Sequence, residues 1–139
     1  MPKVLTRAQL KAYQEEGFVS PIDCISVDQA SQFFKSIESY ENEFKEDVSV
    51  NIRVRAVLAF KWLIDLARHP KLGGALQDCI GQNVLLFLSG VWSKRPGTDT
   101  FVSWHQDGAY NPFDRNTGAT AWIGLTDSTP EKGNIRCLS

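Results

Sequence analysis

The sequence predicts an α+β fold in which helices come first and strands follow. Up to residue 80, apolar side chains recur at helical spacing between capping residues and helix-ending glycines. From Asn83 onward, short apolar and aromatic runs alternate with turn residues, which is typical of strands. The chain has 139 residues, enough for one domain with a buried core. We therefore expect a single domain, helical over about residues 1–82, with the first strands of a sheet over about residues 83–139.

Local capping signals define the first two helices. The first is expected to begin after Thr6, which can form a capping box with Gln9, and to end at Gly17. The second is expected after Ser26, where apolar residues again recur at helical spacing. The acidic stretch at residues 38–47 is expected to end in a loop.

Two further helices are expected before the strands. Residues 54–66 form an apolar segment that Pro70 is expected to end, because proline cannot continue a helix without losing a hydrogen bond. Residues 72–80 should form another short helix, closed by Gly81.

The expected strands are short and lie mostly in the second half of the chain. They are residues 18–19, 84–88, 91–94, 101–105, 120–125 and 135–138. Turn residues separate the later ones, at 95–97, 108–112 and 127–133.

Composition excludes several classes of partner and location. The net charge of −1 gives no reason to expect nucleic acid or an anionic membrane as partner. No apolar run approaches the ~20 residues that cross a bilayer, and the N-terminus lacks a signal-peptide core, so we expect a cytoplasmic protein. Cys24, Cys79 and Cys137 are odd in number and widely spaced, which predicts reduced thiols.

His105 and Asp107 are the candidate metal ligands. In a strand, residues two apart point to the same face, so this imidazole and carboxylate can bind one ion together. Such a pair suits Fe(II), Mn(II) or Zn(II), and the absence of neighbouring thiolates disfavours a structural zinc site. The alternative is a surface histidine beside a capping aspartate.

Other chemically active side chains have simpler alternatives. The only other histidine, His69, lies near a helix end, where it is expected to interact with carbonyls or the helix dipole. Cys137 could act as a third metal ligand beside His105 and Asp107. Lys94 could bind an anionic substrate, or be a solvated lysine at a sheet edge. The same choice, an anion site or a solvated face, applies to Arg53, Arg55 and Lys61.

Several motifs occur together in this chain. They are the run KRPG at 94–97, WHQD at 104–107, Tyr110, WIGLTD at 122–127 and Gly133. Together they resemble the phytanoyl-CoA dioxygenase family of Fe(II)/2-oxoglutarate oxygenases. The resemblance extends from about Leu10 to the last residue.

The resemblance implies a fold and a site. The fold would be a double-stranded β-helix (jelly-roll, cupin-like) with N-terminal helices packed on it, incomplete in this chain. His105 and Asp107 match the first two iron ligands, with Gln106 and Trp122 at the 2-oxoglutarate. Trp104, Tyr110 and Lys94 are candidate substrate or co-substrate contacts.

The implied activity is hydroxylation of a small organic substrate with Fe(II), 2-oxoglutarate and O2. Related halogenases replace the carboxylate at position 107 with a small residue, whereas this chain keeps it. Family members continue into a segment with a distal histidine and then an arginine for 2-oxoglutarate. Because the sequence ends at Ser139, the chain is expected to be C-terminally truncated, and the alternative is a non-catalytic chain or binding module. The oligomeric state is left open.

Overall fold

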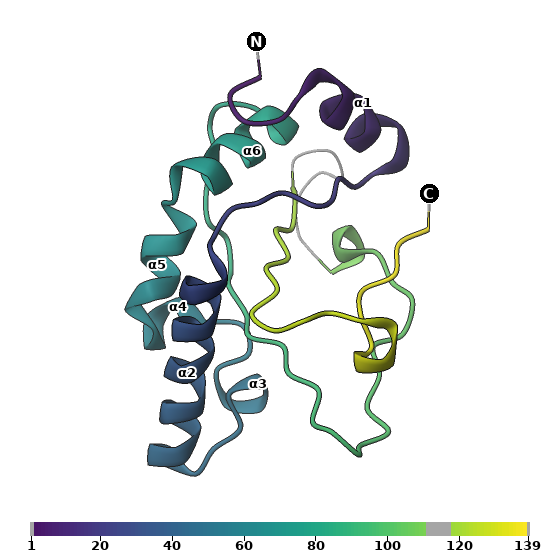
Figure 1. The fold of residues 1–139 in the computed structure, drawn as a ribbon. Helices are drawn as coiled ribbons and strands as arrows, with labels where there is room; N and C mark the ends of the chain where they lie inside the picture. Colours follow the sequence, from purple (N-terminus) through teal and green to yellow (C-terminus); the bar gives the residue numbers. More distant parts are fainter. Residues whose placement is uncertain (1, 111–117, 139) are drawn as a thin grey trace.

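The computed structural model describes residues 2–110 and 118–138, in which helices occupy the first half and extended backbone the second (Figure 1). The α-helices are α1 (Arg7–Glu16), α2 (Val27–Phe44), α3 (Val48–Asn51), α4 (Ala56–Ala59), α5 (Lys61–Ala67) and α6 (Pro70–Ile80). Two 3₁₀ turns follow, η1 (Asp107–Ala109) and η2 (Pro130–Lys132).

The capping signals at α1 and α2 predicted both helices correctly. The Thr6 hydroxyl accepts from the Gln9 amide at 3.1 Å, and the Gln9 side chain accepts from the Thr6 amide at 2.9 Å. Gly17 ends α1 in the left-handed region, with φ of 83°. Ser26 starts α2 through the same kind of capping box. Since α2 ends at Phe44, the loop expected at the end of residues 38–47 is also confirmed.

The helix expected at residues 54–66 is divided into two. Phe60 has extended backbone angles and separates α4 from α5. Pro70 does not end α5, which stops at Ala67, but stands in the first turn of α6. Proline is tolerated there because the first amides of a helix have no partner within the helix. The closure of α6 at Gly81 is confirmed.

The buried core of the described residues comes entirely from the helical half. Every buried apolar side chain lies between positions 5 and 75. Ile37, Val48, Ala56 and Phe60 form one cluster, which brings α2, α3 and α4 together. Beside it, Phe33 of α2 stacks on Trp62 of α5, with ring centroids 4.5 Å apart.

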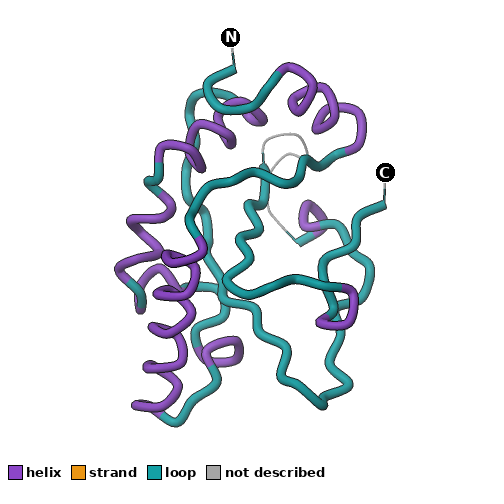
Figure 2. The backbone as a smooth tube through the Cα atoms, in the orientation of Figure 1, coloured by secondary structure: helices purple, strands orange, loops and turns teal. Residues whose placement is uncertain are grey.

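The predicted sheet, and with it the jelly-roll, is wrong for the described residues. None of residues 2–110 and 118–138 forms a strand, including residues 18–19, and Figure 2 draws the described segments after α6 as loop apart from η1 and η2. Leu85 is 86% exposed and Phe101 is 81% exposed. These side chains of the expected strands are therefore not buried against other side chains. The composition does favour strands, but a strand becomes stable only when it pairs with others over a packed face. Within the described residues that pairing does not form.

Several contacts join the extended half to the helices. Ser89 forms a parallel bridge with Arg55, and its carbonyl accepts from the Ala56 amide at 3.2 Å. Further on, the Arg95 guanidinium forms ion pairs with Glu41 and Asp47. Val91 and Leu125 also pack against the central cluster.

The cysteines are free, as the sequence predicted. Burial raises the pKa of the Cys24 and Cys79 thiols, which keeps both protonated near neutral pH. No helix in the described part of the chain is long and apolar enough to cross a membrane.

Asp78 of α6 holds the segment that precedes α1. Its carboxylate accepts from the backbone amides of Lys3, Val4 and Leu5, at distances between 2.7 and 2.9 Å. Desolvation acts to raise the pKa of Asp78, but these amides and the Lys3 charge outweigh it and lower the pKa. Since the folded pKa is depressed, the contact contributes stability above the unfolded value of about 3.9, and that stability is lost as pH falls.

We predict that Asp78→Asn reduces the acid sensitivity of folding. The wild-type chain should lose more unfolding free energy between pH 6 and pH 3 than the variant, as measured by urea denaturation. Asp99→Asn, at an exposed position in the extended half, is the control and should retain the wild-type pH dependence. Equal pH dependence of wild type and Asp78→Asn would contradict this assignment.

Candidate metal centre

The structure brings His105 and Asp107 together. The His105 Nε2 and Asp107 Oδ1 atoms are 3.2 Å apart. The backbone between them is extended at Gln106, with φ of −118° and ψ of 127°, and then turns into η1 at Asp107. Alternation along this extended stretch, rather than a paired strand, therefore places the two side chains on one side.

The orientation of the His105 ring is fixed by its other nitrogen. His105 Nδ1 lies 2.8 Å from the carbonyl oxygen of Ser103. A carbonyl can only accept, so Nδ1 carries the proton, and a neutral ring then has its lone pair on Nε2. Histidines that bind metals commonly donate the second ring nitrogen to a carbonyl or carboxylate in this way.

The Asp107 carboxylate is held by a second contact. The hydroxyl of Thr120 donates to Asp107 Oδ2 at 2.5 Å. Sequence reasoning missed both Thr120 and the Ser103 carbonyl. Thr120 lies 13 residues from Asp107, too far apart for a local pattern to indicate the contact. The Ser103 carbonyl is only two residues from His105, but it is a backbone group that every residue carries, so the residue type does not mark it.

The pair has the spacing expected of two ligands of one metal ion. Two donors with bonds of about 2.1 Å at right angles lie about 3 Å apart. Both side chains are partly exposed, 35% for His105 and 52% for Asp107, so a solvated ion can reach them. Among the described residues, no third histidine, cysteine or carboxylate completes the group.

The Tyr110 ring contacts this pair, and two exposed tryptophans lie near it in the sequence. The Tyr110 ring lies edge-on to the His105 ring, with centroids 5.9 Å apart. Trp104 precedes His105, is 61% exposed, and has the Arg136 guanidinium 5.9 Å from its ring centroid. Trp122 is 55% exposed and lies two residues after Thr120. Gln106 immediately precedes η1, and its carbonyl accepts from the Ala109 amide at 3.0 Å.

Other predicted candidates have different surroundings. The Lys94 ammonium donates to the carbonyl of Gly133, a glycine with φ of 71° that follows η2. His69 precedes α6 in the helical half, and its buried Nδ1 has no hydrogen-bond partner among the described residues, so the expected carbonyl cap is not made through that atom. Cys137 is exposed and belongs to no metal-binding group of the described residues.

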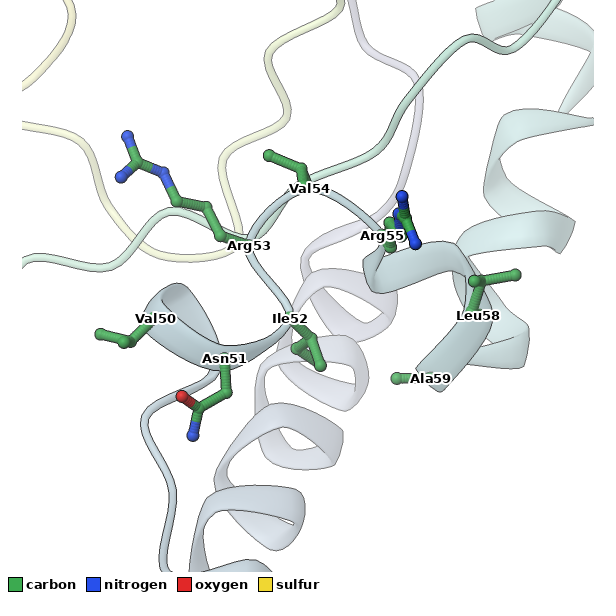
Figure 3. A pocket seen from close by; sticks show the side chains of 8 residues that line it. All are labelled: Val50, Asn51, Ile52, Arg53, Val54, Arg55, Leu58 and Ala59. Carbon is green, nitrogen blue, oxygen red and sulfur yellow. The ribbon is translucent and has the colours of Figure 1, made fainter.

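A surface pocket of about 380 Å³ lies in the helical half, away from the metal pair in sequence (Figure 3). It is lined by residues 50–55 together with Leu58 and Ala59. Arg53 and Arg55, two of the cations predicted as possible anion ligands, line it. However, Arg53 extends away from Leu58 and Ala59, and its guanidinium lies 3.8 Å from the Trp92 ring centroid. The pocket contains none of the predicted metal or co-substrate residues.

An imidazole and a carboxylate, each oriented by a further hydrogen bond, define a candidate two-ligand metal centre. The profile of the phytanoyl-CoA dioxygenase (PhyH) family matches residues 13–138, so the chain belongs to this family. The family predicted from the motifs is therefore confirmed.

One curated relative supports the same assignment. The chain is similar to a probable alpha-ketoglutarate-dependent hypophosphite dioxygenase of Stutzerimonas stutzeri, with 22% identity over 147 residues. The alignment covers 94% of this chain and 51% of the relative, so the chain spans about half the length of the curated relative it matches. No solved structure matches the chain.

We predict that Lys94 stabilises the extended half through its contact with Gly133. Replacing Lys94 with Met removes the donor, and the free energy of unfolding should fall by about 1 kcal/mol, the usual net value of one hydrogen bond. Lys132→Met, which removes an exposed lysine paired with Asp127 at 3.7 Å, is the control and should have a smaller effect. An unchanged denaturation midpoint for Lys94→Met would contradict the prediction.

Proposed function

We propose that this chain carries part of the metal site of an Fe(II)- and 2-oxoglutarate-dependent dioxygenase. The observation that carries the proposal is the pair formed by His105 Nε2 and Asp107 Oδ1, which are 3.2 Å apart. Membership of the phytanoyl-CoA dioxygenase family and the name of the curated relative support this reaction class.

His105 and Asp107 would hold Fe(II), and the metal with 2-oxoglutarate and O2 would supply the oxidising chemistry. The chain's own part is to orient these ligands. The Ser103 carbonyl fixes the protonated nitrogen of His105, so that Nε2 is the one available to a metal. The pair remains accessible to small solutes, as a site for a diffusible co-substrate requires.

Four side chains are proposed to contact the reacting molecules. Gln106 and Trp122 would lie against 2-oxoglutarate, and Trp104 and Tyr110 against the substrate. Tyr110 is supported by its edge contact with the His105 ring, whereas Trp104, whose ring is exposed, rests on the family resemblance. Exposed aromatic faces suit a small organic molecule with apolar surface. Lys94 remains a weaker candidate because its ammonium is bound to Gly133.

A second candidate is a metal-binding or ligand-binding module without turnover. It is favoured by the observation that the described residues offer two metal ligands and no third. A measurement of succinate released from 2-oxoglutarate in the presence of Fe(II) distinguishes the dioxygenase from the binding module. A dioxygenase should release succinate in a metal-dependent way that Asp107→Ala abolishes, whereas a binding module should bind metal and release none.

We predict that Mn(II), a redox-stable substitute for Fe(II), binds at this pair. His105→Ala and Asp107→Ala should each weaken binding at least tenfold, because each removes one of two ligands. Free Mn(II) can be measured by electron paramagnetic resonance during titration of the chain.

The control is His69→Gln, which alters the other histidine and leaves the pair intact. It should bind Mn(II) like the wild-type chain. If both alanine variants retain wild-type affinity while folded, as judged by circular dichroism, the proposed site is wrong.

A further inference from the structure

We propose that Thr120 is a positioning residue that orients the Asp107 carboxylate to bind metal through a single oxygen. This inference rests on the proposed function, because the role is defined toward the metal of that site. It adds a residue that the sequence did not suggest for the site.

The two oxygens of the carboxylate have different partners. Oδ2 accepts from the Thr120 hydroxyl at 2.5 Å, whereas Oδ1 faces His105 Nε2 at 3.2 Å. A hydroxyl-to-carboxylate bond of this length is in the strong, charge-assisted range. With Oδ2 engaged in this way, Oδ1 is the oxygen left facing the histidine, so the geometry favours a monodentate ligand.

The contact also restricts a side chain that is otherwise free to turn. Asp107 is the first residue of η1, and its side chain is 52% exposed. Without the hydroxyl, the carboxylate could rotate into solvent, and metal binding would then have to order it at a cost in entropy. Thr120 thus orients the Asp107 side chain by a hydrogen bond, as the Ser103 carbonyl orients the His105 ring. The Thr120 contact runs through a side chain, so substitution can remove it.

The test compares substitutions that keep or remove the hydroxyl. Thr120→Val preserves shape and removes the donor, Thr120→Ser keeps the donor, and Thr120→Ala provides a second variant without it. Thr126→Val makes the same isosteric change at an exposed position six residues further on. Each chain is titrated with Co(II) alone and followed through the visible absorption of the bound ion. Thermal unfolding without metal is measured in parallel.

Thr120→Val and Thr120→Ala should weaken Co(II) binding about 10-fold to 100-fold, the usual effect of losing a group that orients a ligand. Thr120→Ser should bind within a few-fold of wild type and retain its Co(II) spectrum, and Thr126→Val should match wild type. A purely structural role would lower the melting temperature without a hydroxyl-dependent change in affinity or spectrum.

The results that would overturn the role of Thr120 differ from those that would overturn metal binding by His105 and Asp107. Wild-type affinity in folded Thr120→Val, with binding still dependent on His105 and Asp107, would overturn the role of Thr120 alone. An equal loss in Thr120→Ser or Thr126→Val would overturn it as well. If wild-type binding does not depend on His105 and Asp107, the proposed site fails, and the positioning role fails with it.

Discussion

The contact between Ser89 and the start of α4 is the first of the contacts that attach the extended half to the helices. The first amides of a helix lack partners within the helix, and Arg55, the residue before α4, supplies no side-chain cap. Ser89 provides what is missing, with its carbonyl accepting from Ala56 at 3.2 Å and its hydroxyl from Val57 at 2.8 Å. A side chain at the next residue, Gly90, would run into the Arg53 carbonyl, so this close approach requires glycine. From this attachment the chain continues toward the candidate metal site, with further contacts of Val91, Trp92 and Arg95 to the helical half.

Beyond that attachment, the site is held by short-range polar contacts rather than by a core. The buried apolar side chains of the described residues all lie at positions 5–75, whereas the metal pair is partly exposed. Its geometry depends on two hydrogen bonds, from His105 to the Ser103 carbonyl and from Thr120 to Asp107. A site built in this way is open to small molecules, and its ligand geometry is sensitive to single substitutions.

Sequence reasoning succeeded where the determining interactions are local. Thr6 with Gln9, and Ser26 with Gln29, satisfy helix amides within four residues, so their effect is visible in the sequence. The placement of His105 and Asp107 on one side follows from the extended backbone at Gln106. The strand predictions failed because residue type reports a preference, whereas strand pairing requires a partner elsewhere in the chain. Thr120 was missed for the same reason, since its partner is 13 residues away.

The central claim is that His105 and Asp107 bind one metal ion, and the two histidines of the chain make it directly measurable. A long-range proton–nitrogen spectrum of the imidazoles should contain two ring systems. Substoichiometric Mn(II) should broaden the His105 resonances selectively, Nε2 most strongly, and leave His69 sharp. Equal broadening of both rings, or of neither, would contradict the account.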